Sequence, residues 1–91
     1  VNIEPLKNLH SLERLDLSEN EIVDVRSLSD LYSLQYLSLG SNRVELVSPL
    51  KKLKTLKYLD LGKQFRPIKA EQRHILNFEF NQRKDPTRIN W

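Results

Sequence analysis

The chain has 91 residues and no cysteine, and its 15 basic and 12 acidic side chains leave a net charge of +3. A chain of this length forms one domain at most, and the lack of cysteine excludes a disulfide framework and a thiolate metal site. Residues 1–48 carry 4 basic and 8 acidic side chains, whereas residues 49–91 carry 11 basic and 4 acidic. We therefore expect an electrically polarised molecule that is held together by packing alone.

The sequence contains no apolar run long enough to span a membrane and no signal-like leader. We therefore expect no membrane partner and a cytoplasmic location. The first residue is Val rather than Met, from which we expect an upstream segment to be missing.

A repeat of 22 residues runs through most of the chain, with five leucine positions that recur three times each. These positions are Leu6/Leu28/Leu50, Leu9/Leu31/Leu53, Leu12/Leu34/Leu56, Leu15/Leu37/Leu59 and Leu17/Leu39/Leu61. A further column, Ile3/Val25/Val47, extends the repeat upstream. Each unit has too few apolar groups to close its own core, so neighbouring units must stack.

Each repeat contains a short alternation of apolar and polar residues, such as Leu15-Asp16-Leu17, which predicts a strand with one buried face. Strands at the same position of stacked repeats predict a parallel sheet. The segments that return to the next strand, residues 25–34 and 47–56, space apolar residues three apart, which predicts short helical or 3₁₀ turns. Asn20 and Asn42 follow the strands where the chain turns, and we expect their amides to bond the backbone rather than a ligand.

The motif Leu12-x-x-Leu15-x-Leu17-x-x-Asn20-x-Ile22 and its repetition over residues 34–44 resemble the leucine-rich repeat. The resemblance covers about residues 3–64, and the period is similar to that of the SDS22-like and internalin-like subclass. It implies an α/β solenoid with a parallel sheet on its concave side and short helical or 3₁₀ turns on its convex side. It also implies a non-enzymatic module that binds another protein, whose identity stays open.

The third repeat departs from this motif, because Gln64 stands where Asn is expected and Arg66 where Ile or Val is expected, and Pro67 follows directly after Arg66. We therefore predict a repeat region at residues 1–64, with a half-repeat at 1–8 and three 22-residue repeats of which the last is degenerate. Residues 65–91 are predicted to cap the apolar end of the solenoid. Within this segment, Ile75-x-x-Phe78-x-Phe80 has the spacing of the leucine motif, which predicts a degenerate strand at residues 74–81.

The side chains that alternate with the strand leucines are predicted to form the binding face of the sheet. The predicted binding residues are Arg14, Asp16, Ser18, Tyr36, Ser38, Tyr58 and Asp60. Tyrosine and arginine are enriched at interaction hot spots. Alternatively, Tyr36 and Tyr58 form a same-face pair that only stiffens the sheet.

The same face offers little for catalysis or metal binding. Asp16 and Asp60 belong to strands two apart, and neighbouring strands lie about 4.8 Å apart, so the two carboxylates cannot hold one ion together. Ser38 has no histidine in the neighbouring columns, and His10 and His74 lie at opposite ends of the stack. We therefore predict no catalytic residues, no metal site and no cofactor.

Two other functions stay open. The basic C-terminal half, including Lys51, Lys52, Lys54 and Lys57, is compatible with a nucleic-acid-associated scaffold. No aromatic residue interleaves these lysines, however, and an ordinary solvated outer face is the favoured explanation. The chain is also compatible with a structural fragment of a larger receptor or effector. Self-association through the uncovered N-terminal coil is a further expectation.

Overall fold

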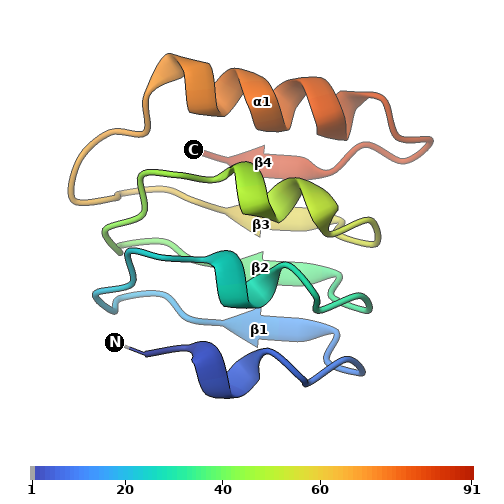
Figure 1. The fold of residues 1–91 in the computed structure, drawn as a ribbon. Coiled ribbons are helices and arrows are strands. Elements are labelled where there is room, and N and C mark those ends of the chain that lie inside the picture. The colour runs from blue at the N-terminus through green and yellow to red at the C-terminus, as the bar shows by residue number, and fades with distance from the viewer. Residues whose placement is uncertain (1) are drawn as a thin grey trace.

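The structure is a computed structural model that describes residues 2–91. Its elements follow one another in a regular winding order (Figure 1). In chain order they are the 3₁₀ helix η1 (Glu4–Leu6), strand β1 (Arg14–Asp16), the 3₁₀ helix η2 (Arg26–Leu28), strand β2 (Tyr36–Ser38), the 3₁₀ helix η3 (Ser48–Lys52), strand β3 (Tyr58–Asp60), helix α1 (Ala70–Asn81) and strand β4 (Arg88–Asn90).

The four strands form one parallel sheet in the order β1-β2-β3-β4, and the helices stack in a second layer beside it (Figure 1). Leu15 pairs with Leu37, Leu37 with Leu59, and Leu59 with Ile89. The first two pairings have the 22-residue spacing of the repeat. The predicted α/β solenoid with a parallel sheet and short helical turns is therefore confirmed.

The repeated leucines fill the space between the two layers. In the second and third coils they are almost fully buried, whereas Leu6, Leu12, Leu15 and Leu17 of the first coil are only partly buried. The difference arises because a coil packs on only one side of the first coil. Stacking, rather than any single unit, therefore closes the core.

A side-chain amide bonds the backbone of the turn that follows β1 and β2, as predicted for asparagine at this position, and it is buried after β2 but exposed after β1. The Asn42 side chain is 2% exposed, donates to the carbonyl oxygens of Leu17, Leu39 and Gly40, and accepts from the Ile22 amide. Asn20 donates to carbonyl oxygens of its own turn. The structural role of both asparagines is thus confirmed.

Gln64 performs the same task in the third repeat, although the sequence marks it as a departure from the motif. Its Nε2 donates to the carbonyl oxygens of Leu39 and Leu61, and its Oε1 accepts from the Val44 amide at 2.9 Å. The longer side chain of Gln64, which is half-buried, thus bonds the backbone groups that are equivalent to the partners of Asn42. The hydrogen-bonded ladder therefore extends one repeat further than the asparagine pattern indicates.

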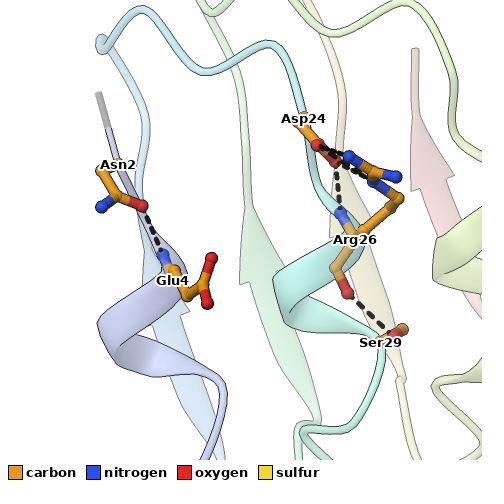
Figure 2. A network of polar contacts seen from close by, with 5 residues as sticks. All are labelled: Asn2, Glu4, Asp24, Arg26 and Ser29. Carbon is orange, nitrogen blue, oxygen red and sulfur yellow. Dashed lines mark hydrogen bonds and ion pairs between the residues drawn. The ribbon is translucent and has the colours of Figure 1, made fainter.

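At the start of each of the first two 3₁₀ helices, a side-chain oxygen accepts a hydrogen bond from a backbone amide (Figure 2). Asn2 Oδ1 accepts from the Glu4 amide at 3.0 Å, and Asp24 Oδ1 accepts from the Arg26 amide at 2.9 Å. Such turns satisfy backbone donors that the helix leaves unpaired. Asn2 and Asp24 occupy the same position of successive repeats.

The predicted strand at residues 74–81 is wrong, because this segment belongs to helix α1. Leu76 and Phe80 are buried four residues apart on one side of the helix, while Phe78 is exposed. Gln72 lies on the same side and attaches the helix to the preceding coil, since its Oε1 accepts from the Val47 amide at 2.9 Å. The helix takes the convex position that 3₁₀ helices hold in earlier coils, and β4 follows it as the fourth strand (Figure 1).

In the last coil, two arginine side chains lie against aromatic rings. The Arg83 guanidinium lies 4.1 Å from the Phe80 ring centroid and donates to the Lys51 carbonyl and the Thr87 hydroxyl. The Arg73 guanidinium lies 5.5 Å from the Trp91 ring centroid. The division into repeats at 1–64 and a capping segment at 65–91 remains a prediction, with which these contacts are consistent.

Candidate functional site

The sheet face turned away from the helices, which we call the open face, carries two columns of side chains. Strand register aligns the first column as Arg14, Tyr36, Tyr58 and Arg88. It aligns the second column as Asp16, Ser38, Asp60 and Asn90. Six of the seven predicted residues therefore lie together in these columns, and Ser18 lies just beyond β1.

The first column contains a stacked pair of tyrosines. The ring centroids of Tyr36 and Tyr58 are 5.2 Å apart, with an angle of 19° between the ring planes. The Arg14 guanidinium lies 4.5 Å from the Tyr36 ring centroid, where the ring face attracts a cation. Both tyrosines are half-buried, so each ring is held in place while part of it stays accessible.

The second column is acidic and joined by hydrogen bonds. Asp60 Oδ1 accepts from the Gly62 amide and from Asn90 Nδ2, each at 2.9 Å. The Ser38 hydroxyl lies 3.5 Å from Asp60 Oδ2 and is itself buried. Asp60 therefore links three neighbouring strands, and Ser38 lies beneath the surface of the face.

Asp16 at the other end of this column is fully exposed and fastened to the turn that follows β1. Its Oδ1 accepts from the Ser18 hydroxyl at 2.7 Å and from the Ser18 amide at 3.0 Å. These two bonds hold the pKa of the Asp16 carboxyl below its ordinary value, because they favour the charged form. Asp16 thus presents a fixed negative charge at neutral pH.

A hollow of about 310 Å³ lies at the strand ends of the second column, bordered by Ser38, Asp60 and Asn90. Gly40 and Gly62 open it, since a Cβ on Gly40 would lie 3.1 Å from Asp60 Oδ2 and one on Gly62 would lie 3.3 Å from Asp60 Oδ1. Larger residues at these positions would press on the carboxylate. The glycines therefore keep Asp60 accessible from the open face.

Arg88 and Asn90 are members of the face that the sequence reasoning missed. They lie on β4, which begins after helix α1 rather than at the predicted place. The available signal was the alternation Arg88-Ile89-Asn90, in which one apolar residue stands between two polar ones. It was too short to stand out without the repeat spacing, since Asn90 follows Asp60 by 30 residues.

The two histidines lie away from the open face. His10 contacts Tyr32, with ring centroids 5.1 Å apart, and His74 contacts Phe78 on helix α1. Among residues 2–91 the structure contains no group of three or more His, Cys, Asp or Glu side chains placed to hold a metal ion. In the same residues, no helix is both long and apolar enough to cross a membrane.

The basic residues of η3, and Lys54 just after it, lie on the side opposite the open face, next to helix α1. The Lys54 ammonium pairs with the Glu79 carboxylate at 2.8 Å, and Lys51 and Arg83 act on the same carboxylate more weakly. The Lys54 hydrogen bond and charge lower the pKa of Glu79. Part of the positive charge is therefore used to join α1 to the preceding coil.

Comparison with known proteins agrees with this architecture. Residues 1–44 match the family described as leucine rich repeat. An internalin (inlF) from Listeria monocytogenes is similar in structure, with a TM-score of 0.80 and 30% identity over 88% of this chain and 23% of its own chain. Internalin C2 (inlC2) from the same organism is similar with a TM-score of 0.67 and 33% identity over 84% of this chain and 33% of its own chain.

A leucine-rich-repeat protein of Leptospira interrogans matches all of this chain, at 25% identity and a TM-score of 0.82. The chain spans 22% of the length of that protein and 23% of the inlF internalin. None of the curated proteins is significantly similar to the sequence. Together, the repeat, the parallel sheet and these matches show that the chain folds as a leucine-rich-repeat solenoid, whose first half matches the leucine rich repeat family.

Proposed function

We propose that the chain is a non-enzymatic module that binds a partner protein through the open face, which is the concave side of the solenoid. The observation that carries the proposal is the column of Arg14, Tyr36 and Tyr58, fixed by stacking on a rigid sheet. The match of the first half to the leucine rich repeat family supports it, since such repeats are generally interaction modules rather than enzymes.

The arrangement favours binding because little has to be ordered when a partner arrives. Each tyrosine offers a large amphipathic surface and has already lost much of its rotamer freedom in the stack. Asp16 and Asp60 lie beside this aromatic strip and offer negative charge to a partner. The proposed contact residues are therefore Arg14, Asp16, Ser18, Tyr36, Tyr58 and Asp60, with Ser38 beneath them in the hollow.

The chemistry of the face gives little support to catalysis. The buried Ser38 hydroxyl has Asp60 as its side-chain neighbour, and no histidine stands between them to carry a proton. His10 and His74 contact Tyr32 and Phe78 instead. A serine without a base within reach is not activated as a nucleophile.

Affinity capture from a cell lysate tests the proposal with a variant pair. Tyr36→Ala combined with Tyr58→Ala removes the aromatic strip, whereas Tyr32→Ala removes an exposed tyrosine that lies off the sheet. We expect a protein captured by the native chain to be lost with the double variant, by roughly 30-fold or more in affinity. The Tyr32→Ala control is expected to capture it unchanged.

Nuclease treatment and a salt series separate this proposal from its alternative. A protein partner bound by the open face stays on the column after nuclease treatment. Retention of nucleic acid that salt releases, undiminished in the double tyrosine variant, would instead assign function to the basic η3 and α1 side. That outcome would contradict the proposal.

A further inference from the structure

Three exposed apolar side chains gather on a flank of the solenoid, between the strand ends and the 3₁₀ helices. Val23, Leu46 and Phe65 are 58%, 66% and 68% exposed. Single exposed apolar residues are common on protein surfaces. These three, however, border adjoining hollows of the same flank.

The repeat does not require any of the three. At the position of Val23 the next repeat has Glu45, and at the position of Leu46 the preceding repeat has Asp24. At the position of Phe65 the preceding repeat has Arg43. The fold therefore accepts a charged residue at each position, and packing of the solenoid does not account for the apolar ones.

Leu46 also lacks the side-chain to backbone hydrogen bond that polar residues make at the same position of the first two repeats. Asn2 and Asp24 stand at the same repeat position and accept from the backbone at the start of η1 and η2 (Figure 2). The hydrocarbon side chain of Leu46 cannot accept such a bond at the start of η3. An exposed leucine here costs stability compared with aspartate, which is unexpected unless the side chain has another use.

Two hollows meet between these side chains and form one surface, which we call the flank groove. The larger, of about 660 Å³, is bordered by Val23, Leu46 and Glu45. The smaller, of about 280 Å³, is bordered by Val23, Glu45 and Phe65. Their shared border joins them across successive coils, and the larger lies within the usual range of about 300–1,000 Å³ for binding sites.

The charges around the flank groove indicate what it would bind. Asp24 and Arg26 neutralise each other in an ion pair of 2.7 Å. Within residues 2–91, Glu45 and Arg66 make no ion pair, so the shared border is acidic and the Phe65 end is basic. Arg43 strengthens the basic end, with its guanidinium 5.1 Å from the Phe65 ring centroid.

We propose that the flank groove is a second binding surface, which takes a short peptide segment of a partner protein. The segment carries apolar side chains that contact Val23, Leu46 and Phe65. It also carries a basic side chain opposite Glu45 and an acidic side chain opposite Arg66. This surface is separate from the open face and does not depend on the function proposed for that face.

Selection from a library of random dodecapeptides displayed on phage tests the proposal. The library is panned on the native chain, with counter-selection on a triple variant that copies the neighbouring repeats, Val23→Glu, Leu46→Asp and Phe65→Arg. We expect enriched peptides with apolar residues around a basic one and an acidic residue near one end. A synthetic peptide of that sequence should bind the triple variant roughly 30-fold or more weakly, as for loss of hot-spot contacts.

The single variant Leu46→Asp separates binding from folding. We expect it to raise the melting temperature, because aspartate restores the missing cap, and at the same time to weaken peptide binding. The variant with Tyr36→Ala and Tyr58→Ala should bind the peptide normally, which distinguishes the flank groove from the open face.

Several results would overturn the proposal. They are failure to enrich any peptide, enrichment of peptides that bind the triple variant equally well, and a melting temperature that falls with Leu46→Asp. Sedimentation of the native chain can give a further result that contradicts the proposal. A dimer that the triple variant cannot form would show that the groove is occupied by a second copy of the chain.

Discussion

The stacked rings of Tyr36 and Tyr58 belong both to the sheet and to the proposed binding face. Their contact, with centroids 5.2 Å apart, is the geometry of a stabilising aromatic pair. The interpretation that the pair only stiffens the sheet therefore agrees with the structure as far as stability is concerned. The contribution to folding must be measured separately from the contribution to binding.

A double-mutant cycle on Tyr36 and Tyr58 measures the folding contribution. We expect the two alanine substitutions to interact by about 0.5–1.5 kcal/mol in the free energy of unfolding, which is typical of an aromatic pair. Urea unfolding of the native chain, both single variants and the double variant gives this value. A coupling of zero would show that the rings contact each other without stabilising the sheet.

Asn42 offers a second prediction at the level of one residue. Replacing it with alanine removes four hydrogen bonds and leaves the buried Ile22 amide without its acceptor. We expect a loss of about 2–4 kcal/mol in the free energy of unfolding. The matched change Asn20→Ala should cost less than about 1 kcal/mol, because that side chain is exposed and water can replace it. Equal losses at the two sites would contradict the role of the buried amide.

Most of the open face could be predicted because residues of one column share one repeat position. The 22-residue period aligns Tyr36 with Tyr58, and strand pairing confirms that alignment. The burial of Ser38 could not be predicted in this way, since it depends on the neighbouring Asp60 and on how closely the strands pack. The repeat period predicts which way a side chain points, but it does not predict how much of the side-chain surface neighbouring residues cover.

Among the elements, the 3₁₀ helices and the first three strands follow from the repeat, whereas helix α1 does not. Ile75, Phe78 and Phe80 have the spacing of a leucine motif, but burial selects Leu76 and Phe80, which are four residues apart. A short apolar pattern of this kind fits a strand and a helix equally well. The choice is made by contacts with earlier coils, such as the bond from the Val47 amide to Gln72, which lie far away in the sequence.

The pairing of Lys54 with Glu79 gives a prediction for the docking of α1. The Glu79 pKa is lowered, so its charged form stabilises the folded chain above the ordinary glutamate pKa of about 4.3. This contribution is lost as the pH falls through the folded value. We expect Glu79→Gln to be less stable than the native chain at pH 7 and equally stable once the pH has fallen below the lowered pKa of Glu79.

Unfolding by urea at several pH values measures this difference. High salt should reduce it at neutral pH, because the pair is exposed to solvent. The substitution Glu71→Gln, in the first turn of the same helix, serves as a control for the loss of one negative charge. A difference that stays constant across the pH range would contradict the assignment to the ion pair.

On the scale of the whole molecule, the chain is a stack of coils with different charges at its two ends. The first half is acidic and the second half is basic. The open face and the basic side of η3 and α1 lie on opposite layers of this stack (Figure 1). A protein partner bound by the open face and a nucleic acid bound by the basic side would therefore contact different surfaces.

A nuclear magnetic resonance footprint of the captured partner on the isotope-labelled chain separates binding through the open face from binding through the basic side. If the partner binds the open face, amide signals of Arg14, Tyr36 and Tyr58 shift on binding, while those of Tyr32 and Lys52 stay in place. Shifts confined to η3 and α1, with the three strand residues unchanged, would contradict binding through the open face.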